Sequence, residues 1–437
     1  RDAFYQKELE LRLSRSYGPG RYDPAYEEKG SDYPAAYVRW TEQRNLSAFL
    51  GLLAEGRVRL EELVTQRFPF SRATEAYELL AGAAARSVLG VVLEYPAPQE
   101  EPRRIVLTVS PRARAGRARI GMIGAGSFAT GTMAPLLQRL GADLRGIVSA
   151  GGLSARSAGE RFGFAYLAGE PEELIHDPEI DAIIIATRHG EHARLAAAAL
   201  RAGKAVFVEK PLALDEASLE DVVAAAAIGG GPLMVGFNRR FAPATRFLAE
   251  RLRHTGGARV VHARVNAGAI PAGSWVHDPV EGGGRLLGEG CHFIDLVLHL
   301  AGSPAVQVEA VGIGGADPEA TLQDNVQVTM RCADGSLATV LYTSKGEPRA
   351  GKERVELFAG GASGVLDDFR RAEFWKGRRE LWRGAQDKGH AGALRAFVDG
   401  LRGGHWPIPL AELEASTRLT IAAAQALQAG SPIRLGA

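Results

Sequence analysis

The sequence predicts an α/β fold with a doubly wound parallel sheet in the middle of the chain, followed by a second, mainly antiparallel sheet. Between residues 119 and 237, short and wholly apolar strands alternate with helices. This is the pattern of strands that are covered by helices on both faces. After residue 240, apolar and polar residues alternate over longer segments, as in strands with one face toward solvent.

The elements of the first region follow one another in strict order. We expect its strands at residues 119–123, 144–149, 182–186, 205–208 and 233–237. We expect its helices at residues 128–140, 155–162, 193–202 and 216–228. The second region is expected to supply strands at residues 260–265, 306–311, 326–332 and 337–343, and then two helices at residues 392–401 and 410–429.

Composition and charge exclude several classes of protein. The 437 residues include 52 basic and 51 acidic side chains, a net charge of +1, which argues against binding nucleic acid or a membrane through bulk charge. A hydrophobic content of 46% allows a large core. The chain has only two cysteines, Cys291 and Cys332, so we expect neither a disulfide framework nor a metal site. Neither a bilayer-length apolar run nor a signal-type leader is recognisable, which predicts a cytoplasmic protein.

A glycine-rich turn follows the strand expected at residues 119–123. Gly124 and Gly126 precede Ala129 in the pattern Gly-x-Gly-x-x-Ala, with Ser127 and Phe128 at the start of the next helix. The first glycine permits the tight turn, and the second lets backbone N–H groups approach a pyrophosphate at the helix N-terminus. Because the pattern lies between a strand and a helix, it favours a dinucleotide site over a merely structural turn.

The choice between NAD and NADP stays open. Ser149 stands at the end of the second strand, where an acid would hold the ribose 2′-hydroxyl, and the next carboxylate is Glu160. Arg156 is near enough in the sequence to pair with a 2′-phosphate, or it is simply a surface residue of its helix. We therefore expect NAD or NADP as cofactor.

The segment Glu209-Lys210-Pro211 ends another strand of the parallel sheet. The carboxyl ends of such strands line the ligand crevice. A lysine there can donate a hydrogen bond to a substrate hydroxyl.

Together these motifs resemble the glucose-fructose oxidoreductase/inositol dehydrogenase (Gfo/Idh/MocA) family over residues 117–437. The resemblance is carried by the glycine turn, by Ala186-Thr187 followed by His192, by Gly203-Lys204, by residues 209–211 and by residues 282–295 (GGGRLLGEGCHFID). It implies a Rossmann domain that binds NAD(P) and a second domain with an open antiparallel sheet. It also implies hydride transfer at a carbinol carbon of a sugar, sugar nucleotide or cyclitol, and a homo-oligomer, either a dimer or a tetramer.

The resemblance assigns roles to individual residues. Lys210 matches the family's catalytic lysine, and His292 matches the histidine proposed to exchange a proton with substrate. Asp295, three residues further along the same helix, is expected to orient His292. Many members carry Asp four residues before this histidine, where Gly288 stands here, so either Glu289 replaces it or this branch works without the acid. A hydrolytic or lyase variant of NAD chemistry also stays open. We expect the remaining cofactor contacts from Thr187, His192 and Glu209.

Other polar residues are candidates for binding substrate. Arg239 and Arg240 could clamp an anionic group, since guanidinium groups fit such oxygens, or could form a salt-bridged hinge between the domains. Trp275 and Asp278 are candidates for lining a sugar pocket.

The first 95 residues have a different resemblance. Segments 11–26, 38–41, 44–46, 67–70, 76–80 and 88–95 resemble the C-terminal end of a medium-chain, zinc-type alcohol dehydrogenase. They are similar to a subgroup in which that enzyme is fused to the family above, in proteins associated with surface-polysaccharide biosynthesis. No His precedes residue 176 and no Cys precedes residue 291, so the usual zinc ligands cannot be assembled. We expect this segment, which we interpret as truncated, to be inactive alone and to expose an apolar edge.

The predicted organisation has five parts. They are a partial dehydrogenase segment (1–95), a linker with one short strand at 105–110 (96–116), a Rossmann domain (117–237), a substrate domain (238–390) and C-terminal helices that pack back on the Rossmann domain (391–437). The leading hypothesis is an NAD(P)-dependent oxidoreductase with a sugar-type substrate. The alternatives are a non-catalytic NAD(P)-sensing module of the same fold and a fragment that needs its missing part to fold. The presence of Lys210 and His292 favours the enzyme.

Overall fold

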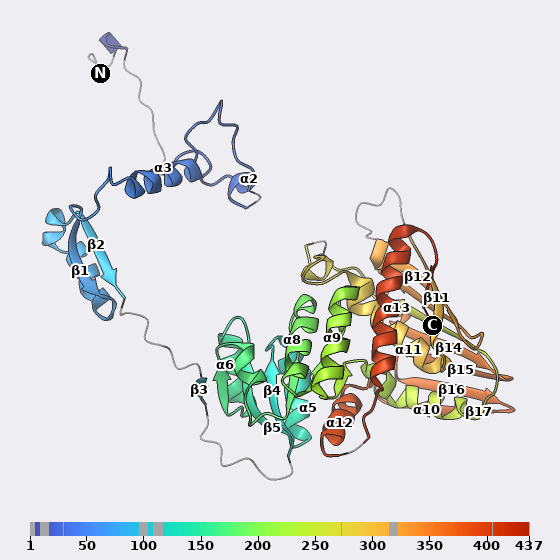
Figure 1. Cartoon of the computed structure of the whole chain (residues 1–437). Coiled ribbons are helices and arrows are strands. Elements are labelled where there is room, and N and C mark those ends of the chain that lie inside the picture. Colours follow the sequence, from blue (N-terminus) through green and yellow to red (C-terminus); the bar gives the residue numbers. More distant parts are fainter. Residues whose placement is uncertain are drawn as a thin grey trace. The chain divides into compact units, whose positions relative to one another are not determined.

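The computed structural model describes residues 5–8, 17–28, 30–95, 104–107, 117–271, 273–313, 322–403 and 405–436. The chain divides into two compact units, Arg1–Glu101 and Pro102–Ala437. Figure 1 traces both. Among the residues that the structure describes, none of the helices has the length and apolar character needed to span a bilayer.

The first unit has little hydrophobic core. Strands β1 (Val64–Pro69) and β2 (Gly90–Glu94) pair in parallel, with helix α4 (Ala73–Ala81) between them in the sequence. Helices α2 (Pro24–Glu27) and α3 (Glu42–Ala54) precede them. Of the described residues in this unit, Ala76 alone is a buried hydrophobic residue, while Trp40, Leu50 and Tyr77 are 53%, 64% and 68% exposed. Large apolar side chains therefore face solvent here, as the sequence led us to expect.

The second unit begins with a seven-stranded sheet in the order β3-β6-β5-β4-β7-β8-β9. Its parallel strands are β4 (Arg119–Ile123), β5 (Asp143–Val148), β6 (Tyr166–Ala168), β7 (Ala182–Ile185), β8 (Ala205–Val208) and β9 (Leu233–Val235). The connecting helices are α5 (Ala134–Arg139), α6 (Leu153–Phe162), α7 (Pro171–Ile175), α8 (His192–Arg201) and α9 (Glu216–Gly229). Every residue of β7 and β8 is buried, which explains their uniformly apolar sequence.

The second sheet has nine strands in the order β17-β16-β15-β14-β10-β13-β12-β11-β18. Its neighbours are antiparallel except for β10 and β13, which pair in parallel. The strands are β10 (Arg259–Asn266), β11 (Ala305–Gly312), β12 (Asn325–Cys332), β13 (Leu337–Thr343), β14 (Glu353–Ala359), β15 (Ala362–Asp367), β16 (Arg371–Lys376), β17 (Arg378–Arg383) and β18 (Ile433–Arg434). The doubly wound parallel sheet and the mainly antiparallel sheet predicted from the sequence are thus both confirmed.

Four further helices pack around the two sheets of this unit. Helices α10 (Pro243–Leu252) and α11 (Cys291–Ala301) pack on the nine-stranded sheet. Helix α13 (Leu410–Ala429) contacts both α9 and β11, so it lies between the two layers (Figure 1). Helix α12 (His390–Leu401) packs Phe397 edge-on against Phe207 of β8, with 5.4 Å between the ring centroids.

The structure differs from the expectation mainly in its short elements. Strand β3 (Arg104–Val106) lies inside the segment expected to be a linker, where it pairs antiparallel with β6. It is shorter than the expected strand at 105–110, and residues 108–110 lie outside the described residues. The short β6 and α7 and the run of strands β14–β17 were missed. Lengths of three to five residues in β6 and α7 leave no periodicity to detect.

Candidate active site

A groove at the carboxyl ends of β4, β5 and β7, here called the cofactor groove, collects most of the predicted cofactor residues. Gly124 follows β4 with φ +105°, and a Cβ there would lie 2.3 Å from the carbonyl oxygen of Ala186, so only glycine fits. At Gly126 a Cβ would meet nothing within 4 Å, which leaves its backbone open to the groove. The groove is lined in part by Gly124, Gly126, Ser127, Phe128, Ser149 and Thr187.

These residues fit a dinucleotide. The helix that begins at Ser127 presents its first N–H groups, which have no partners within a helix, and the bare Gly126 lets a phosphate approach them. Ser149 Oγ lies 2.8 Å from Ser154 Oγ. Ser149 and the next residue, Ala150, both line the cofactor groove. A pyrophosphate would be held by the glycine turn, with the adenosine ribose toward Ser149.

Arg156 does not reach the cofactor groove. It is absent from the residues that line the groove, and its guanidinium pairs instead with Glu160, 3.1 Å away on the same exposed helix face. The expectation that Arg156 holds a 2′-phosphate is therefore not supported by its position. Because Glu160 lies one helical turn after Arg156, its carboxylate neutralises the guanidinium charge on the helix surface.

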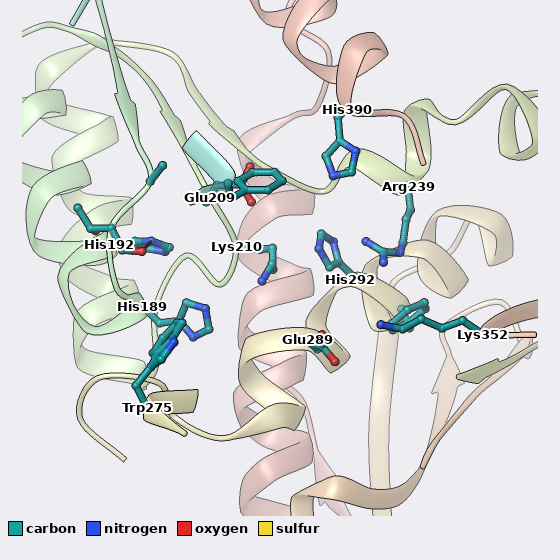
Figure 2. A pocket seen from close by; sticks show the side chains of 14 residues that line it. His189, His192, Glu209, Lys210, Arg239, Trp275, Glu289, His292, Lys352 and His390 are labelled. Atoms are coloured by element: carbon teal, nitrogen blue, oxygen red, sulfur yellow. Dashed lines mark hydrogen bonds between the residues drawn. The ribbon is translucent and has the colours of Figure 1, made fainter. Parts of the chain in front are cut away.

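A second cavity of about 340 Å³, here called the reaction pocket, adjoins the groove. Phe128, Ala186, Thr187 and Trp275 line both spaces. Figure 2 shows the side chains that converge in this pocket. Besides those four, it is lined by His189, His192, Glu209, Lys210, Arg239, Glu289, His292, Phe293, Lys352 and His390.

Lys210 and His292 come from different domains, and both line the reaction pocket. Lys210 follows β8, and its Nζ donates a hydrogen bond to the carbonyl oxygen of Gly288, 2.8 Å away. His292 is 7% exposed, and its Nδ1 has no hydrogen-bond partner among the described residues. Burial, together with the positive charges of Arg239 and Lys210, holds the pKa of His292 well below its ordinary value. The imidazole is therefore neutral, with the free Nδ1 in the pocket lining.

Glu289 lies in the pocket as an ionised carboxylate with its own partners. Burial alone would raise its pKa, but the charge of Lys352, the Tyr342 hydroxyl and the Arg285 guanidinium lower it to about 2. Arg285 donates to Glu289 at 3.0 Å, and Tyr342 donates to it as well. Glu289 is thus at the expected place, but its carboxylate is already engaged by protein donors.

Asp295 does not orient His292. Both of its carboxylate oxygens accept hydrogen bonds from Arg240, each at 2.7 Å, and Oδ1 also accepts from Ser416 at 3.0 Å. The residue is fully buried on the side of α11 that faces α13. A buried carboxylate needs a paired cation, and the bidentate guanidinium of Arg240 supplies it. The expected contact between Asp295 and His292 is therefore wrong.

The two adjacent arginines diverge, so they do not form an anion clamp. Arg239 lines the reaction pocket, where it binds both oxygens of Glu353 at 3.0 Å and lies over the ring of Phe293. Arg240 points away, toward Asp295 and Glu412. Both arginines form buried salt bridges, as the hinge alternative expects, and Arg239 is the one of the two that lines the reaction pocket.

Of the two residues expected to line a sugar pocket, Trp275 lines the reaction pocket and Asp278 does not. Trp275 lies against both spaces, with Arg188 4.5 Å from its ring and His189 edge-on at 4.8 Å. Asp278 is exposed, and its Oδ1 accepts from the N–H groups of Val280 and Glu281, each at 2.8 Å. Asp278 therefore caps a turn outside the pocket, and its expected sugar contact is wrong.

His192, which is buried, and Glu209, which is half-buried, also line the reaction pocket. His192 Nδ1 donates to the carbonyl oxygen of Pro211 at 2.8 Å, and burial lowers its pKa to about 4. Burial raises the pKa of Glu209 to about 7. His192 thus ties the start of α8 to the loop after Lys210, and Glu209 titrates near neutrality beside the lysine.

Sequence reasoning missed three pocket residues, namely His189, Lys352 and His390. His189 follows the end of β7, so the position of the strand end could have identified it. Lys352 precedes β14 and His390 begins α12. Neither residue belongs to a motif, and only the packing of distant elements brings them to the pocket.

Comparisons with known proteins agree with this site. The model of an oxidoreductase family with an NAD-binding Rossmann fold matches residues 118–237, and the Gfo/Idh/MocA C-terminal domain matches residues 253–366. Inositol 2-dehydrogenase 2 of Paenarthrobacter aurescens is 28% identical over 65% of this chain and 92% of that protein. Myo-inositol 2-dehydrogenase of Thermotoga maritima is 29% identical over 55% of this chain and 72% of that protein.

Other relatives match over a smaller share of their length. The chain spans 60% of the oxidoreductase YrbE of Bacillus subtilis, at 28% identity over 47% of this chain. Among solved structures, the oxidoreductase domain protein from Kribbella flavida has a TM-score of 0.66 at 22% identity, covering 74% of this chain and 100% of that one. Levoglucosan dehydrogenase in complex with NADH and levoglucosan has a TM-score of 0.64 at 20% identity, with the same coverage. These two likenesses establish the fold.

The cofactor groove, the neighbouring pocket and the two matched domains lead to one conclusion. The glycine turn fits the phosphates of NAD, and the matched Rossmann model is NAD-binding. The chain therefore belongs to the Gfo/Idh/MocA family of oxidoreductases with an NAD-binding Rossmann fold.

Proposed function

We propose that this protein is a dehydrogenase of a cyclitol or sugar, with Lys210 and His292 as its catalytic residues. The observation that carries the proposal is the meeting of a lysine ammonium and a neutral, unpartnered imidazole where the pocket adjoins the groove. The relatives named as inositol dehydrogenases support a polyol substrate. NAD, when bound, accepts the hydride of the carbinol carbon.

The two residues have complementary roles in this proposal. Lys210 donates a hydrogen bond to the reacting hydroxyl and stabilises negative charge that develops on its oxygen. His292 accepts the hydroxyl proton at Nδ1 as the carbonyl forms. The carbinol thus loses one hydride and one proton, and the proton stays on the imidazole. Trp275 and Phe128, which line both spaces, exclude water from the place where the hydride moves.

The test is NAD⁺ reduction by purified protein with myo-inositol, glucose and an anhydrosugar. We expect Lys210→Ala and His292→Ala each to lower kcat/KM for the best substrate by about a hundredfold or more. Lys376→Ala and His405→Ala, which change an exposed lysine and an exposed histidine, should leave it unchanged. Tight NADH binding without turnover of any substrate would instead favour the sensing module.

We further propose that residues 1–95 are the tail of a medium-chain dehydrogenase and that the chain acts in surface-polysaccharide biosynthesis in the cytoplasm. The parallel β1–α4–β2 unit and its exposed apolar side chains support an incomplete domain. The two buried free cysteines suit a reducing compartment. Turnover of a nucleotide-linked sugar in preference to free sugars would support the polysaccharide role, and exclusive turnover of free inositol would contradict it.

A further inference from the structure

The hydrogen bond of His189 fixes which of its nitrogens carries the proton. Its Nδ1 lies 2.8 Å from the carbonyl oxygen of Gly282. A carbonyl oxygen can only accept, so Nδ1 must be the donor, and in the neutral ring Nε2 then carries a lone pair. The ring is neutral because burial, together with the charge of Lys210, lowers the pKa of His189 to about 3.

The lone pair of His189 is left without a protein partner. His189 is only 7% exposed, yet no donor from the described residues makes a hydrogen bond to its Nε2. The residue lines the reaction pocket, and its ring is held edge-on against Trp275, 4.8 Å between centroids. Nε2 is not among the fully buried unpaired side-chain atoms, so its lone pair is open to the reaction pocket and can accept a hydrogen bond from a ligand there.

The position of His189 is complementary to that of His292. Figure 2 shows Lys210 between the two imidazoles, and the charge of Lys210 acts on the pKa of both rings. The absence of a side chain at Gly288 makes this arrangement possible, because a Cβ there would lie 2.7 Å from Cε1 of His189. Gly288 also holds Lys210 through its carbonyl oxygen.

Other polar groups of the pocket are less available to a substrate hydroxyl. Glu289 already accepts from Arg285 and Tyr342, and His192 is only 1% exposed, so its ring is less accessible than that of His189. His189 therefore offers a free acceptor on the far side of Lys210 from His292.

We propose that the reaction pocket recognises a vicinal diol, with the hydroxyl next to the reacting carbinol donating its hydrogen bond to Nε2 of His189. This inference rests on the proposed function, because it takes the reacting hydroxyl to lie at Lys210 and His292. It assigns to one residue the recognition of the second hydroxyl, which a cyclitol or sugar has and an isolated secondary alcohol lacks. His189 is then a substrate-binding residue that no motif assigned.

The decisive variant is His189→Asn. The asparagine amide can take the place of Nδ1–H and keep the bond to Gly282, but nothing replaces Nε2. We expect kcat/KM for myo-inositol or glucose to fall about tenfold or more, with unchanged KM for NAD⁺ and unchanged melting temperature. His189→Gln, whose longer amide reaches the place of Nε2, should recover part of the loss. The surface variant His405→Asn serves as the matched control.

Binding measurements test the inference without turnover. In calorimetric titrations of the full chain saturated with NADH, we expect cyclohexane-1,2-diol to bind about tenfold more tightly than cyclohexanol, and His189→Asn to abolish that preference. Equal binding of the diol and the alcohol by the unmodified protein would overturn the inference, as would a preference that His189→Asn leaves intact. If the diol preference is present but no polyol is oxidised, the proposed dehydrogenase function fails and the diol site stands.

Discussion

Glu209 is a half-buried carboxyl group with a pKa near neutrality, and it stands next to Lys210 in the sequence. Burial raises its pKa from 4.5 to about 7. A carboxyl whose folded pKa is raised stabilises the fold fully below its unfolded pKa, and this stabilisation is lost as the pH rises through the folded value. Relative to Glu209→Gln, the unmodified protein should therefore lose up to about 3 kcal/mol of unfolding free energy between about pH 4.5 and 8.

Urea denaturation at a series of pH values measures this difference. Glu160→Gln, which changes an exposed carboxylate of α6, should shift the unfolding free energy little at any pH. A constant difference between the unmodified protein and Glu209→Gln across that range would show that Glu209 does not titrate there.

At this scale the sequence could predict residues that belong to strand ends and turns. Gly124, Lys210 and His292 each belong to a local sequence motif. In the structure Gly124 lines the cofactor groove, and Lys210 and His292 line the reaction pocket. Side-chain direction was not predictable, because it depends on partners from distant elements. Arg240 turns away from Arg239 because Asp295 and Glu412 hold it, and Asp295 misses His292 for the same reason.

A buried ion pair links helices α11 and α13. Arg240, in the turn before α10, pairs with Asp295 of α11. Arg240 is 7% exposed and Asp295 is fully buried, and Ser416 of α13 donates to the same carboxylate. Removing one partner leaves the other charge buried and unpaired, which costs about 3–5 kcal/mol. We therefore expect Arg240→Met to lower the free energy of unfolding by this amount, and Arg240→Met/Asp295→Leu to recover most of it.

The exposed pair of Arg156 and Glu160 provides the control for chemical denaturation. Their side chains are 62% and 58% exposed, so Arg156→Ala should cost less than about 1 kcal/mol. The same variant should leave KM for NAD⁺ unchanged, since Arg156 lies outside the groove lining. If Arg240→Met were no more costly than Arg156→Ala, the buried pair would not join the helices.

Elements with a strong pattern were predictable from the sequence, and short or charged ones were not. The apolar strands β4 and β8 lie at the expected residues because burial on both faces demands an unbroken apolar run. Strands β16 and β17 carry arginines and two glutamates among their apolar residues, and because Glu373 is buried and Glu380 is half-buried, the apolar alternation is broken. Strand β3, Arg104–Val106, overlaps the strand expected at 105–110 but is shorter.

At the scale of the whole molecule, the sequence predicted the order of the two sheets. It did not predict which apolar residues of the second sheet are exposed. Val260 of β10 pairs with Leu337 of β13 on one side and with Phe358 of β14 on the other. Residues directly opposite each other in neighbouring strands share a face. These three side chains are 44%, 41% and 49% exposed, so an apolar row crosses the outer face of the nine-stranded sheet.

An apolar row on an open sheet suits a self-complementary interface between two copies of the chain. We therefore expect the protein to be a dimer or tetramer, and Phe358→Asp to convert it to a monomer, because the variant buries an unpaired charge at the centre of the interface. Size-exclusion chromatography with light scattering measures the mass. Ile228→Asp, which places the same charge at an 80% exposed apolar residue of α9, should leave the assembly intact. A monomeric unmodified protein, or an oligomer that survives Phe358→Asp, would mean that this face is not the interface.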